Sequence, residues 1–384
     1  MKISRIGGEI QPFIVMEILE RAQELERQGE SIIHLEVGEP DFETPECIRK
    51  RAVDAVRKGL THYTHSLGTY SLRYEIAKYY NEKYKLGVEV KAENVIVTSG
   101  TSPAMLLIFG AILDRGDEVI ISNPHYPCYP NFIRFVGGKP KFVFVREEEG
   151  FQLNPEKVRK AITKKTKAIL INSPANPTGN LLSSEWMEEI ASFGIPVISD
   201  EIYHGLVYEG EARSILEFAG KGRDLIVLNG FSKLFAMTGW RLGYIIAIED
   251  LVRPIQKMIQ NFFISPNAFV QEAAIAALNE CEKETEQMRK IYDERRKFMI
   301  KRLREIGFGI TVEPTGAFYV FANAKKFTND SYRYAFEILE KAKVGVTPGI
   351  DFGSGGEGYI RFSYANSLEN IKEGLARIER FLAR

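Results

Sequence analysis

Lys233 is the residue of this sequence whose surroundings most favour covalent chemistry. It stands in the segment Phe231–Gly243, between two apolar runs of strand type, 225–228 and 244–248. Burial disfavours the charged ammonium form of a lysine, and a neutral amine attacks carbonyl carbons. Lys233 is therefore a candidate for a lysine that bonds covalently to a carbonyl compound. A solvated lysine in a loop between two strands is the alternative interpretation.

Three charged residues in apolar surroundings indicate ligands of opposite charge. Arg241 follows Lys233 by eight residues, and Arg361 lies inside the apolar run 359–363. A guanidinium matches a planar carboxylate, so Arg361 predicts a bound carboxylate, with an internal Asp or Glu partner as the alternative. Asp200 ends another apolar run, and an unpaired buried carboxylate is costly. We therefore expect a cationic partner for Asp200, and a helix N-cap is the alternative.

Small, amide and aromatic residues complete the set of candidates. Gly100, Thr101 and Ser102 stand between a strand-like run and a helical stretch. Backbone N–H groups and the helix dipole bind anions at such a place, although a simple N-cap is the alternative. Asn176 lies beside two prolines that fix the backbone, which suits an amide that binds a ligand in one orientation. Tyr126 either packs in the core or stacks on a flat ring.

Alternating strand and helix patterns must position these residues. Between residues 48 and 285, short β-branched runs alternate with amphipathic helical stretches, which predicts an α/β unit with a mostly parallel sheet covered on both faces. Ligands gather at the carboxyl ends of such strands. The expected strands are 95–98, 118–121, 142–145, 168–171, 196–199, 225–228 and 244–248, and the expected helices include 106–113, 155–162 and 184–193.

The two ends of the chain predict a smaller α+β unit. Residues 286–384 hold short strands and helices, and residues 1–47 are expected to join them. Gly38 ends a short strand, where a glycine either makes a plain turn or lets a ligand approach the backbone. Residues 267–305 predict one long helix or two abutting helices. The strands expected after Gly307 are 310–312, 318–321 and 359–363, and the helices are 332–342 and 368–382.

The composition is that of an ordinary soluble globular protein. The 384 residues include 51 basic and 51 acidic ones, so the charge indicates neither nucleic acid nor a membrane surface as a partner. The longest apolar run, 104–113, is too short to span a bilayer. Cys47, Cys128 and Cys281 lie far apart, so we expect no metal-binding or redox pair and a reducing compartment. The first residues lack the apolar core of a signal peptide, and we expect a cytoplasmic protein.

Two further patterns resemble known binding motifs only weakly. The stretch Gly353–Gly358 matches Gly-x-Gly-x-x-Gly, but a strand is expected after it where the dinucleotide fingerprint has a helix. We expect a flexible turn there. His62 and His65 are not accompanied by further metal ligands, so we expect no zinc site.

The motifs taken together resemble one family of enzymes. They are Gly-Glu-Pro-Asp-Phe, Asn-Pro-Thr-Gly, Asp-Glu-Ile-Tyr, Ser-Lys followed by Gly-Trp-Arg-Leu-Gly, and Ile-Arg-Phe-Ser, in this order from residue 38 to residue 363. This set is similar to that of the class I/II pyridoxal-phosphate-dependent aminotransferases of fold type I. Within that family it most resembles the prokaryotic aspartate aminotransferase-like subgroup.

The resemblance implies pyridoxal 5′-phosphate as cofactor and a role for each residue around its ring. Lys233 would hold the cofactor covalently and move a proton between the substrate and the cofactor. Asp200 would pair with the protonated pyridine nitrogen. Tyr203 and Asn176 would hydrogen-bond the phenolic oxygen, and Tyr126 would stack on the ring face.

The cofactor phosphate has its own implied partners. They are Gly100, Thr101, Ser102 and Arg241, together with Tyr63 from the neighbouring subunit, which implies a homodimer. Relatives often carry a Ser or Thr three residues before the lysine, where this chain has Gly230. Ser232 is expected to supply a hydroxyl instead.

The resemblance also implies how the substrates bind and react. Arg361 and Gly38 would bind the substrate carboxylate, with Asn176 beside them. The implied reaction moves an α-amino group from an L-amino acid to 2-oxoglutarate. Ser102-Pro103 stands where certain relatives place a lysine, so the donor remains open among aspartate, aromatic and other amino acids. The alternatives are a C–S β-lyase of the same fold and, from a different class, a cofactor-dependent regulator, for which we see no appended DNA-binding domain.

Overall fold

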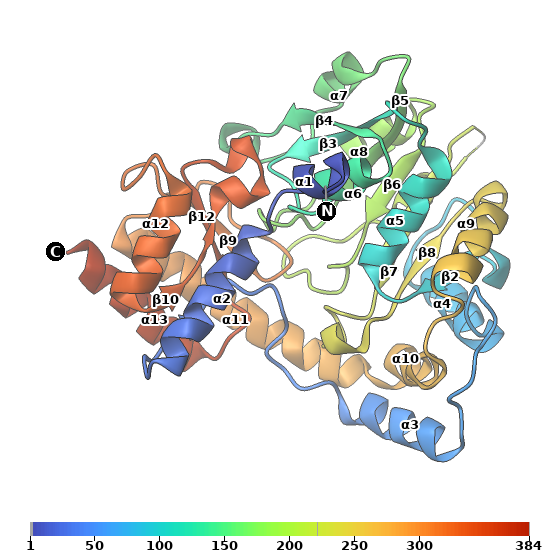
Figure 1. The fold of residues 1–384 in the computed structure, drawn as a ribbon, viewed down its shortest axis with the longest axis horizontal. Coiled ribbons are helices and arrows are strands. Elements are labelled where there is room, and N and C mark those ends of the chain that lie inside the picture. The colour runs from blue at the N-terminus through green and yellow to red at the C-terminus, as the bar shows by residue number, and fades with distance from the viewer. Residues whose placement is uncertain (1–2, 221, 384) are drawn as a thin grey trace.

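The computed structural model describes residues 3–220 and 222–383. Helices cover both faces of its largest sheet (Figure 1). The strands of this sheet are β2 (Val95–Thr98), β3 (Glu118–Asn123), β4 (Lys139–Phe144), β5 (Thr166–Asn172), β6 (Val197–Asp200), β7 (Leu225–Gly230) and β8 (Gly243–Ile246). Their order is β2-β8-β7-β6-β5-β3-β4, and only β8 runs antiparallel to its neighbours. The prediction of a mostly parallel α/β sheet is confirmed.

The strand sequences are apolar without interruption because both faces of the sheet are covered. In β2 the side chains of Val95 and Val97 join one hydrophobic core, and Ile96 joins another core on the opposite face. Successive side chains of a strand point to opposite faces, so each face needs its own apolar partners. All residues of β2, β6, β7 and β8 are buried.

Three of the helices around this sheet, α4, α7 and α8, begin at a side chain that caps them. Thr69 accepts a hydrogen bond from Leu72 N at the start of α4, and Ser183 accepts one from Trp186 N at the start of α8. The helices of this part are α3 (Glu46–Arg57), α4 (Tyr70–Lys83), α5 (Thr101–Ile112), α6 (Tyr129–Phe135), α7 (Pro155–Ala161), α8 (Ser184–Ala191), α9 (Glu249–Phe262) and α10 (Ala268–Glu280). Short 3₁₀ and π turns are η1 (Ala92–Asn94), η2 (Glu147–Glu149), η3 (Ile215–Phe218), η4 (Thr238–Trp240), η5 (Ile338–Ala342), η6 (Gly349–Phe352) and η7 (Ser354–Gly356).

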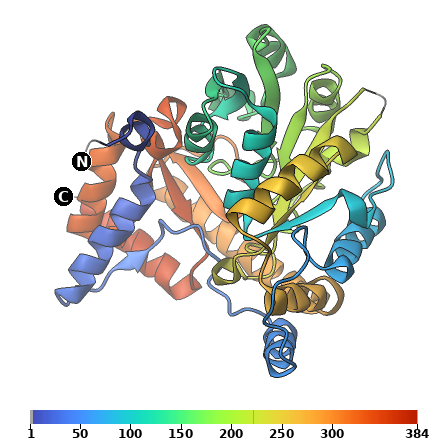
Figure 2. The same ribbon diagram turned by 45° about the vertical axis from the view of Figure 1, so that its right-hand side comes forward.

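The two ends of the chain pack together beside the large sheet, and the long helix α11 runs between the two parts (Figures 1 and 2). The N-terminal strand β1 pairs in parallel with β10, which ties the first residues to the C-terminal ones. A three-stranded antiparallel sheet has the order β11-β12-β9. The elements are α1 (Arg5–Glu9), α2 (Ile14–Arg27), β1 (Ile33–His34), α11 (Glu282–Ile306), β9 (Tyr319–Asn323), α12 (Ser331–Glu337), β10 (Val344–Gly345), β11 (Thr347–Pro348), β12 (Tyr359–Ser363) and α13 (Leu368–Leu382).

The structure contradicts one secondary-structure prediction for the C-terminal part and decides between the alternatives of another. The strand expected at 310–312 is wrong: the structure has only an isolated bridge between Gly309 and Asn323 there. The helical stretch expected at 267–305 is two helices, α10 and α11, which are separated by the non-helical residue Cys281. Among residues 3–220 and 222–383, no helix has the length and apolarity needed to cross a bilayer.

The cysteine spacing predicted no metal-binding or redox pair and a reducing compartment, and this prediction missed a disulfide. Cys47 in α3 and Cys281 between α10 and α11 form a disulfide, although they are 234 residues apart in the sequence. The reason is that α3 packs against α10 in space, and separation along the chain does not measure that distance. The disulfide also removes the cysteine argument for a reducing compartment. Cys128 is not disulfide-bonded.

Candidate active site

A cavity of about 300 Å³ lies between the large sheet and the smaller sheet. Nearly all the candidate residues of the sequence line it, and Tyr63 and Gly100 are the exceptions. The lining candidates are Gly38, Thr101, Ser102, Tyr126, Asn176, Asp200, Tyr203, Ser232, Lys233, Arg241 and Arg361. The sheet topology explains this convergence, because Asp200 ends β6, Lys233 follows β7 and Thr101 follows β2. The carboxyl ends of these parallel strands meet at one edge of the sheet.

Lys233 holds its amine against the backbone of the smaller part. Its Nζ donates a hydrogen bond of 2.7 Å to the carbonyl oxygen of Gly38. Burial lowers the pKa of Lys233 to about 8, and the positive charges of Arg361 and Arg241 act in the same direction. A substantial fraction of this amine is therefore neutral near pH 8, as a nucleophile requires.

Asp200 has hydrogen-bond donors but no cationic side chain as a partner. Tyr129 donates its hydroxyl to Oδ2 over 2.7 Å, and Ile202 N donates to Oδ1 over 3.2 Å. None of the ion pairs in the described part of the chain includes Asp200, so no side chain there supplies the cationic partner expected for it. Burial raises the pKa of Asp200 to about 6. A cation that enters the cavity as part of a ligand would supply the missing charge.

Arg361 is buried and has only neutral acceptors. Its Nη1 donates to Asn176 Oδ1 over 2.9 Å, and its Nη2 donates to the carbonyl oxygen of Glu36 and to Thr347 Oγ1. Its Nε is buried without a hydrogen-bond partner among the described residues. No Asp or Glu pairs with it in that part of the chain, so the interpretation as an internal ion pair is wrong. The remaining interpretation is a carboxylate ligand.

The turn from β2 into α5 forms a cradle for an anion. Gly100 has φ of 101° and precedes the first helical residue, Thr101. A Cβ atom at Gly100 would lie 2.7 Å from Nη2 of Arg241, so the absence of a side chain lets the guanidinium close over this turn. Arg241 itself is exposed and donates to the carbonyl oxygen of Thr238. Helix N–H groups and a guanidinium together suit a phosphate.

The glycine at position 230 has a structural cause. Gly230 lies opposite Gly243 in the β7–β8 pair. A Cβ atom at Gly230 would lie 3.0 Å from Gly243 Cα and 3.0 Å from the carbonyl oxygen of Leu242, so a serine there requires the strands to move apart. Ser232 lines the cavity, so its hydroxyl is the nearest replacement in the sequence.

Several residues of the site escaped the sequence reasoning. Tyr129 binds Asp200, and the Tyr319 hydroxyl lies 2.8 Å from the Tyr203 hydroxyl. The repeated tyrosine in Tyr126-Pro-Cys-Tyr129 was a usable signal, whereas nothing marks Tyr319 in a sequence read alone. The start of α2 also lines the cavity, with Phe13, Val15, Met16 and Leu19.

The remaining candidates lie away from the cavity. Tyr63 is 80% exposed on this chain. The stretch Gly353–Gly358 forms a turn ahead of β12, as expected, and Gly355 N donates to Asn123 Oδ1.

The residues present fit pyridoxal phosphate at each of its polar groups. Asp200, a buried carboxylate without a cationic side chain as partner in the described residues, suits the protonated pyridine nitrogen. The partly neutral amine of Lys233 suits the aldehyde, and the cradle at Gly100 suits the phosphate. The half-buried Tyr126 ring, 5.3 Å from the Tyr129 ring, offers a flat surface for the cofactor ring.

Comparison with known proteins agrees with this chemistry. Residues 30–378 match the family model of the class I and II aminotransferases. The chain is 46% identical to a (5-formylfuran-3-yl)methyl phosphate transaminase of Methanocaldococcus jannaschii, over 96% of each chain. It is 40% identical to an aspartate aminotransferase of Pyrococcus horikoshii, over 96% of this chain and 94% of that one. The structure of an aspartate aminotransferase from Thermus thermophilus with maleate superposes with a TM-score of 0.94, at 37% identity and over 99% of each chain. The chain therefore belongs to the class I and II aminotransferases and is a pyridoxal-phosphate-dependent transaminase.

Proposed function

We propose that this aminotransferase carries the α-amino group of an L-amino acid to 2-oxoglutarate. The observation that carries the proposal is the state of Arg361, which is buried, bound only to neutral acceptors, and without a partner at Nε among the described residues. An α-amino acid and a 2-oxo acid both carry a carboxylate next to the reacting carbon. One arginine can therefore hold either substrate in the same pose, so a single site serves both half-reactions in turn.

Residues that line the cavity would hold the cofactor ring and move the proton at the substrate α-carbon. The bound cofactor supplies an electron sink for the substrate α-carbon. We assign Lys233 to covalent attachment and to the proton at that carbon, because its amine is the nucleophile of the cavity. Asp200 keeps the pyridine nitrogen protonated, Tyr126 stacks on the ring, and Tyr203 binds the phenolic oxygen. Asn176 accepts from Arg361 through Oδ1, which leaves its Nδ2 to donate to that same oxygen.

The cofactor phosphate and the substrate carboxylate are assigned to separate sets of residues. We assign the phosphate to the cradle and the carboxylate to Arg361 with Gly38 beside it. The residues assigned to the phosphate are Gly100, Thr101, Ser102, Ser232 and Arg241.

The donor side chain is proposed to be uncharged. Of the cations that line the cavity, Lys233, Arg241 and Arg361 already have roles, and α2 contributes an apolar wall. The names of the relatives do not decide the donor, since one is an aspartate aminotransferase and another acts on a furan phosphate. We expect aromatic or aliphatic donors to react faster than aspartate.

The working unit is proposed to be a homodimer. Tyr63 is 80% exposed, and Thr64 N donates to Ser265 Oγ, which places the Tyr63 loop beside the exposed Phe262 and Ile264. An apolar, aromatic surface of this kind suits a second copy of the chain. In the dimer Tyr63 would reach the phosphate of the partner's site.

The division of the chain is also a proposal. Residues 48–285 would form the large unit, since all strands of the seven-stranded sheet lie within them. Residues 1–47 and 286–384 would form the smaller unit, which the β1–β10 pair supports. The cytoplasmic location expected from the sequence stays a prediction.

A donor panel tests the proposed function. Each amino acid other than glutamate is offered with 2-oxoglutarate, and kcat/KM is measured by glutamate formation. Turnover of at least one donor supports the proposal, and the ranking names the donor. Failure with every donor contradicts the choice of acceptor. Release of pyruvate and ammonia from cystathionine without any oxo acid would instead indicate a β-lyase. A ranking led by aspartate would contradict the uncharged donor and point to a cation from the partner subunit.

A further inference from the structure

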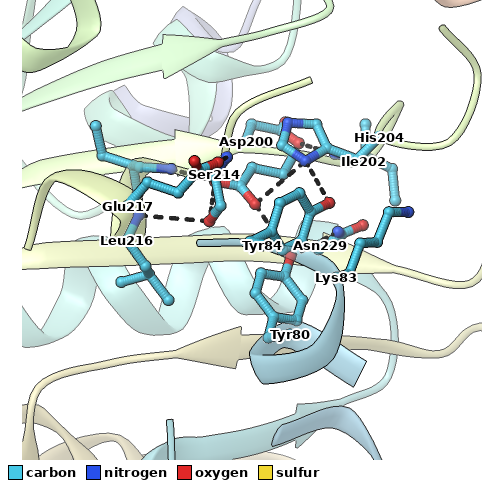
Figure 3. A network of polar contacts seen from close by, with 12 residues as sticks. Tyr80, Lys83, Tyr84, Asp200, Ile202, His204, Ser214, Leu216, Glu217 and Asn229 are labelled. Atoms are coloured by element: carbon cyan, nitrogen blue, oxygen red, sulfur yellow. Dashed lines mark hydrogen bonds and ion pairs between the residues drawn. The ribbon is translucent and has the colours of Figure 1, made fainter. Parts of the chain in front are cut away.

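A second polar cluster lies beside the strand ends that carry Asp200 and Lys233. It is called the Glu201 cluster here, and its members come from α4, from β7, and from the turns that follow α4 and β6 (Figure 3). None of its members lines the cavity. The Glu201 cluster consists of Tyr80, Tyr84, Glu201, His204, Ser214 and Asn229, all of them buried.

The carboxylate of Glu201 is fully enclosed and fully satisfied. Tyr80 donates its hydroxyl to Oε2 over 3.1 Å, and Ser214 Oγ and Ile215 N donate to Oε1 over 3.0 and 2.9 Å. Burial raises the pKa of Glu201 to about 7, against the effect of these hydrogen bonds. A carboxylate at 0% exposure is costly for stability alone, so its place in the fold calls for another role.

The Tyr80 hydroxyl connects Glu201 to the next strand. Asn229 Nδ2 donates to this hydroxyl over 2.9 Å, and Asn229 Oδ1 accepts from Gly230 N over 2.7 Å. Asn229 lies four residues before Lys233, and Glu201 directly follows Asp200. One chain of hydrogen bonds therefore joins the carboxyl ends of β6 and β7.

His204 and Tyr84 fix the same turn without bridging the two strands. The Tyr84 hydroxyl and His204 Nδ1 share a hydrogen bond of 2.8 Å. Burial lowers the pKa of His204 to about 3, so the imidazole is neutral. His204 N also donates to the carbonyl oxygen of Glu201. His204 Nδ1 also lies 3.5 Å from Glu201 Oε2. Tyr84 is a control for the Tyr80 link, because its own hydroxyl makes no hydrogen bond to Glu201 or Asn229 among the described residues.

We propose that Glu201 is a positioning residue that, through Tyr80 and Asn229, sets the spacing between Asp200 and Lys233. The inference rests on the proposed roles of those two residues. The pyridine nitrogen and the aldehyde carbon of the cofactor lie across a rigid ring, so their two protein partners must stand at a fixed separation. A small error in that separation weakens binding and reaction at the same time.

The test compares three variants by their binding of pyridoxal phosphate. Glu201→Gln keeps the size of the side chain and still accepts from Ser214 and Ile215, but its amide nitrogen meets a Tyr80 hydroxyl that already accepts from Asn229. Tyr80→Phe removes the shared hydroxyl, and it tests the inference if Glu201→Gln does not fold. Tyr84→Phe is the control. Apoenzyme is titrated with pyridoxal phosphate, and Tm is measured in parallel.

We expect Glu201→Gln and Tyr80→Phe to raise the Kd for pyridoxal phosphate about tenfold and to shift the pH at which the bound cofactor changes absorbance. The kcat should fall while KM for the donor stays near the wild-type value, because Arg361 is untouched. Tyr84→Phe should lower Tm alone. If all three variants lower Tm and leave Kd and the absorbance midpoint unchanged, the cluster is structural only and the inference is wrong. A Lys233→Ala variant that keeps the wild-type absorbance of the bound cofactor would instead overturn the assignment of Lys233.

Discussion

Lys233 Nζ lies 2.7 Å from the carbonyl oxygen of Gly38, so the reactive amine from the large sheet is held by the backbone of the smaller part. Gly38 cannot carry a side chain there, because a Cβ atom would lie within contact of the Tyr319 hydroxyl. A carbonyl compound bound by this amine would therefore lie close to the Gly38 backbone. The hydrogen bond thus couples attachment of the cofactor to the place proposed for the substrate carboxylate.

The first prediction concerns the pH dependence of cofactor attachment. Burial lowers the pKa of Lys233 to about 8, so the rate at which apoenzyme captures pyridoxal phosphate should rise up to about that pH and level off above it. Stopped-flow absorbance measures this rate, and Lys233→Ala is the control without capture. A rate that keeps climbing towards pH 10 would indicate a solvated lysine with an ordinary pKa of about 10.4.

The second prediction concerns Tyr129, which donates its hydroxyl to Asp200. This hydrogen bond favours the ionised carboxylate, so Tyr129→Phe should raise the pKa of Asp200 above its present value of about 6. The acidic limb of the pH profile for binding of pyridoxal phosphate to apoenzyme should therefore move to higher pH. Tyr334→Phe, a buried tyrosine away from the cavity, serves as the control and should leave the limb in place. An unmoved limb in Tyr129→Phe would contradict the role of this hydroxyl.

The third prediction concerns the geometry of Arg361 rather than its charge. Arg361→Lys keeps the positive charge and loses the planar fork, so kcat/KM should fall about tenfold to hundredfold for every donor. Arg377→Lys is a matched control, because Arg377 also donates to backbone carbonyl oxygens, but on α13 away from the cavity. Equal activity of Arg361→Lys and wild type would show that the carboxylate binds elsewhere.

The fourth prediction concerns the disulfide between Cys47 and Cys281. It closes a loop of more than two hundred residues, so its removal should destabilise the protein by about 2–4 kcal/mol. Cys47→Ser should lower Tm, and a reducing agent should lower the Tm of the wild type but not of this variant. Cys128→Ser should leave Tm nearly unchanged. Two free thiols in place of the bond, found by mass spectrometry without reduction, would contradict the disulfide.

The sequence predicted the large sheet well because its strands are buried on both faces. Such strands read as short β-branched runs, and all seven were found within a few residues of their observed bounds, as with β2 at Val95–Thr98. The smaller part was harder. The strand β1 has only two residues, Ile33–His34, and β10 and β11 are as short, so no periodic pattern marks them. Their existence depends on pairing between the two ends of the chain.

Candidate residues were predicted where motif and strand end coincide, as at Asp200 and Lys233. Tyr319 was missed because its contact with Tyr203 joins positions more than a hundred residues apart. Cys47 and Cys281 show the same limit, since helix packing rather than sequence spacing brings them together. The lack of space for a side chain at Gly230 also became clear only from the strand that lies opposite.

Residues from both ends of the chain line the cavity, and this affects how a bound ligand stabilises the folded chain. Gly38 and Arg361 both line the cavity and stand near opposite ends of the sequence. A ligand that touches both therefore draws its affinity from a completely folded chain, and no nascent or truncated fragment that lacks either end can bind it in full. By mass action, substrate then protects the folded protein from unfolding and from proteases that act on opened chains. Saturation with ligand therefore stabilises complete, folded copies of this chain more than truncated copies.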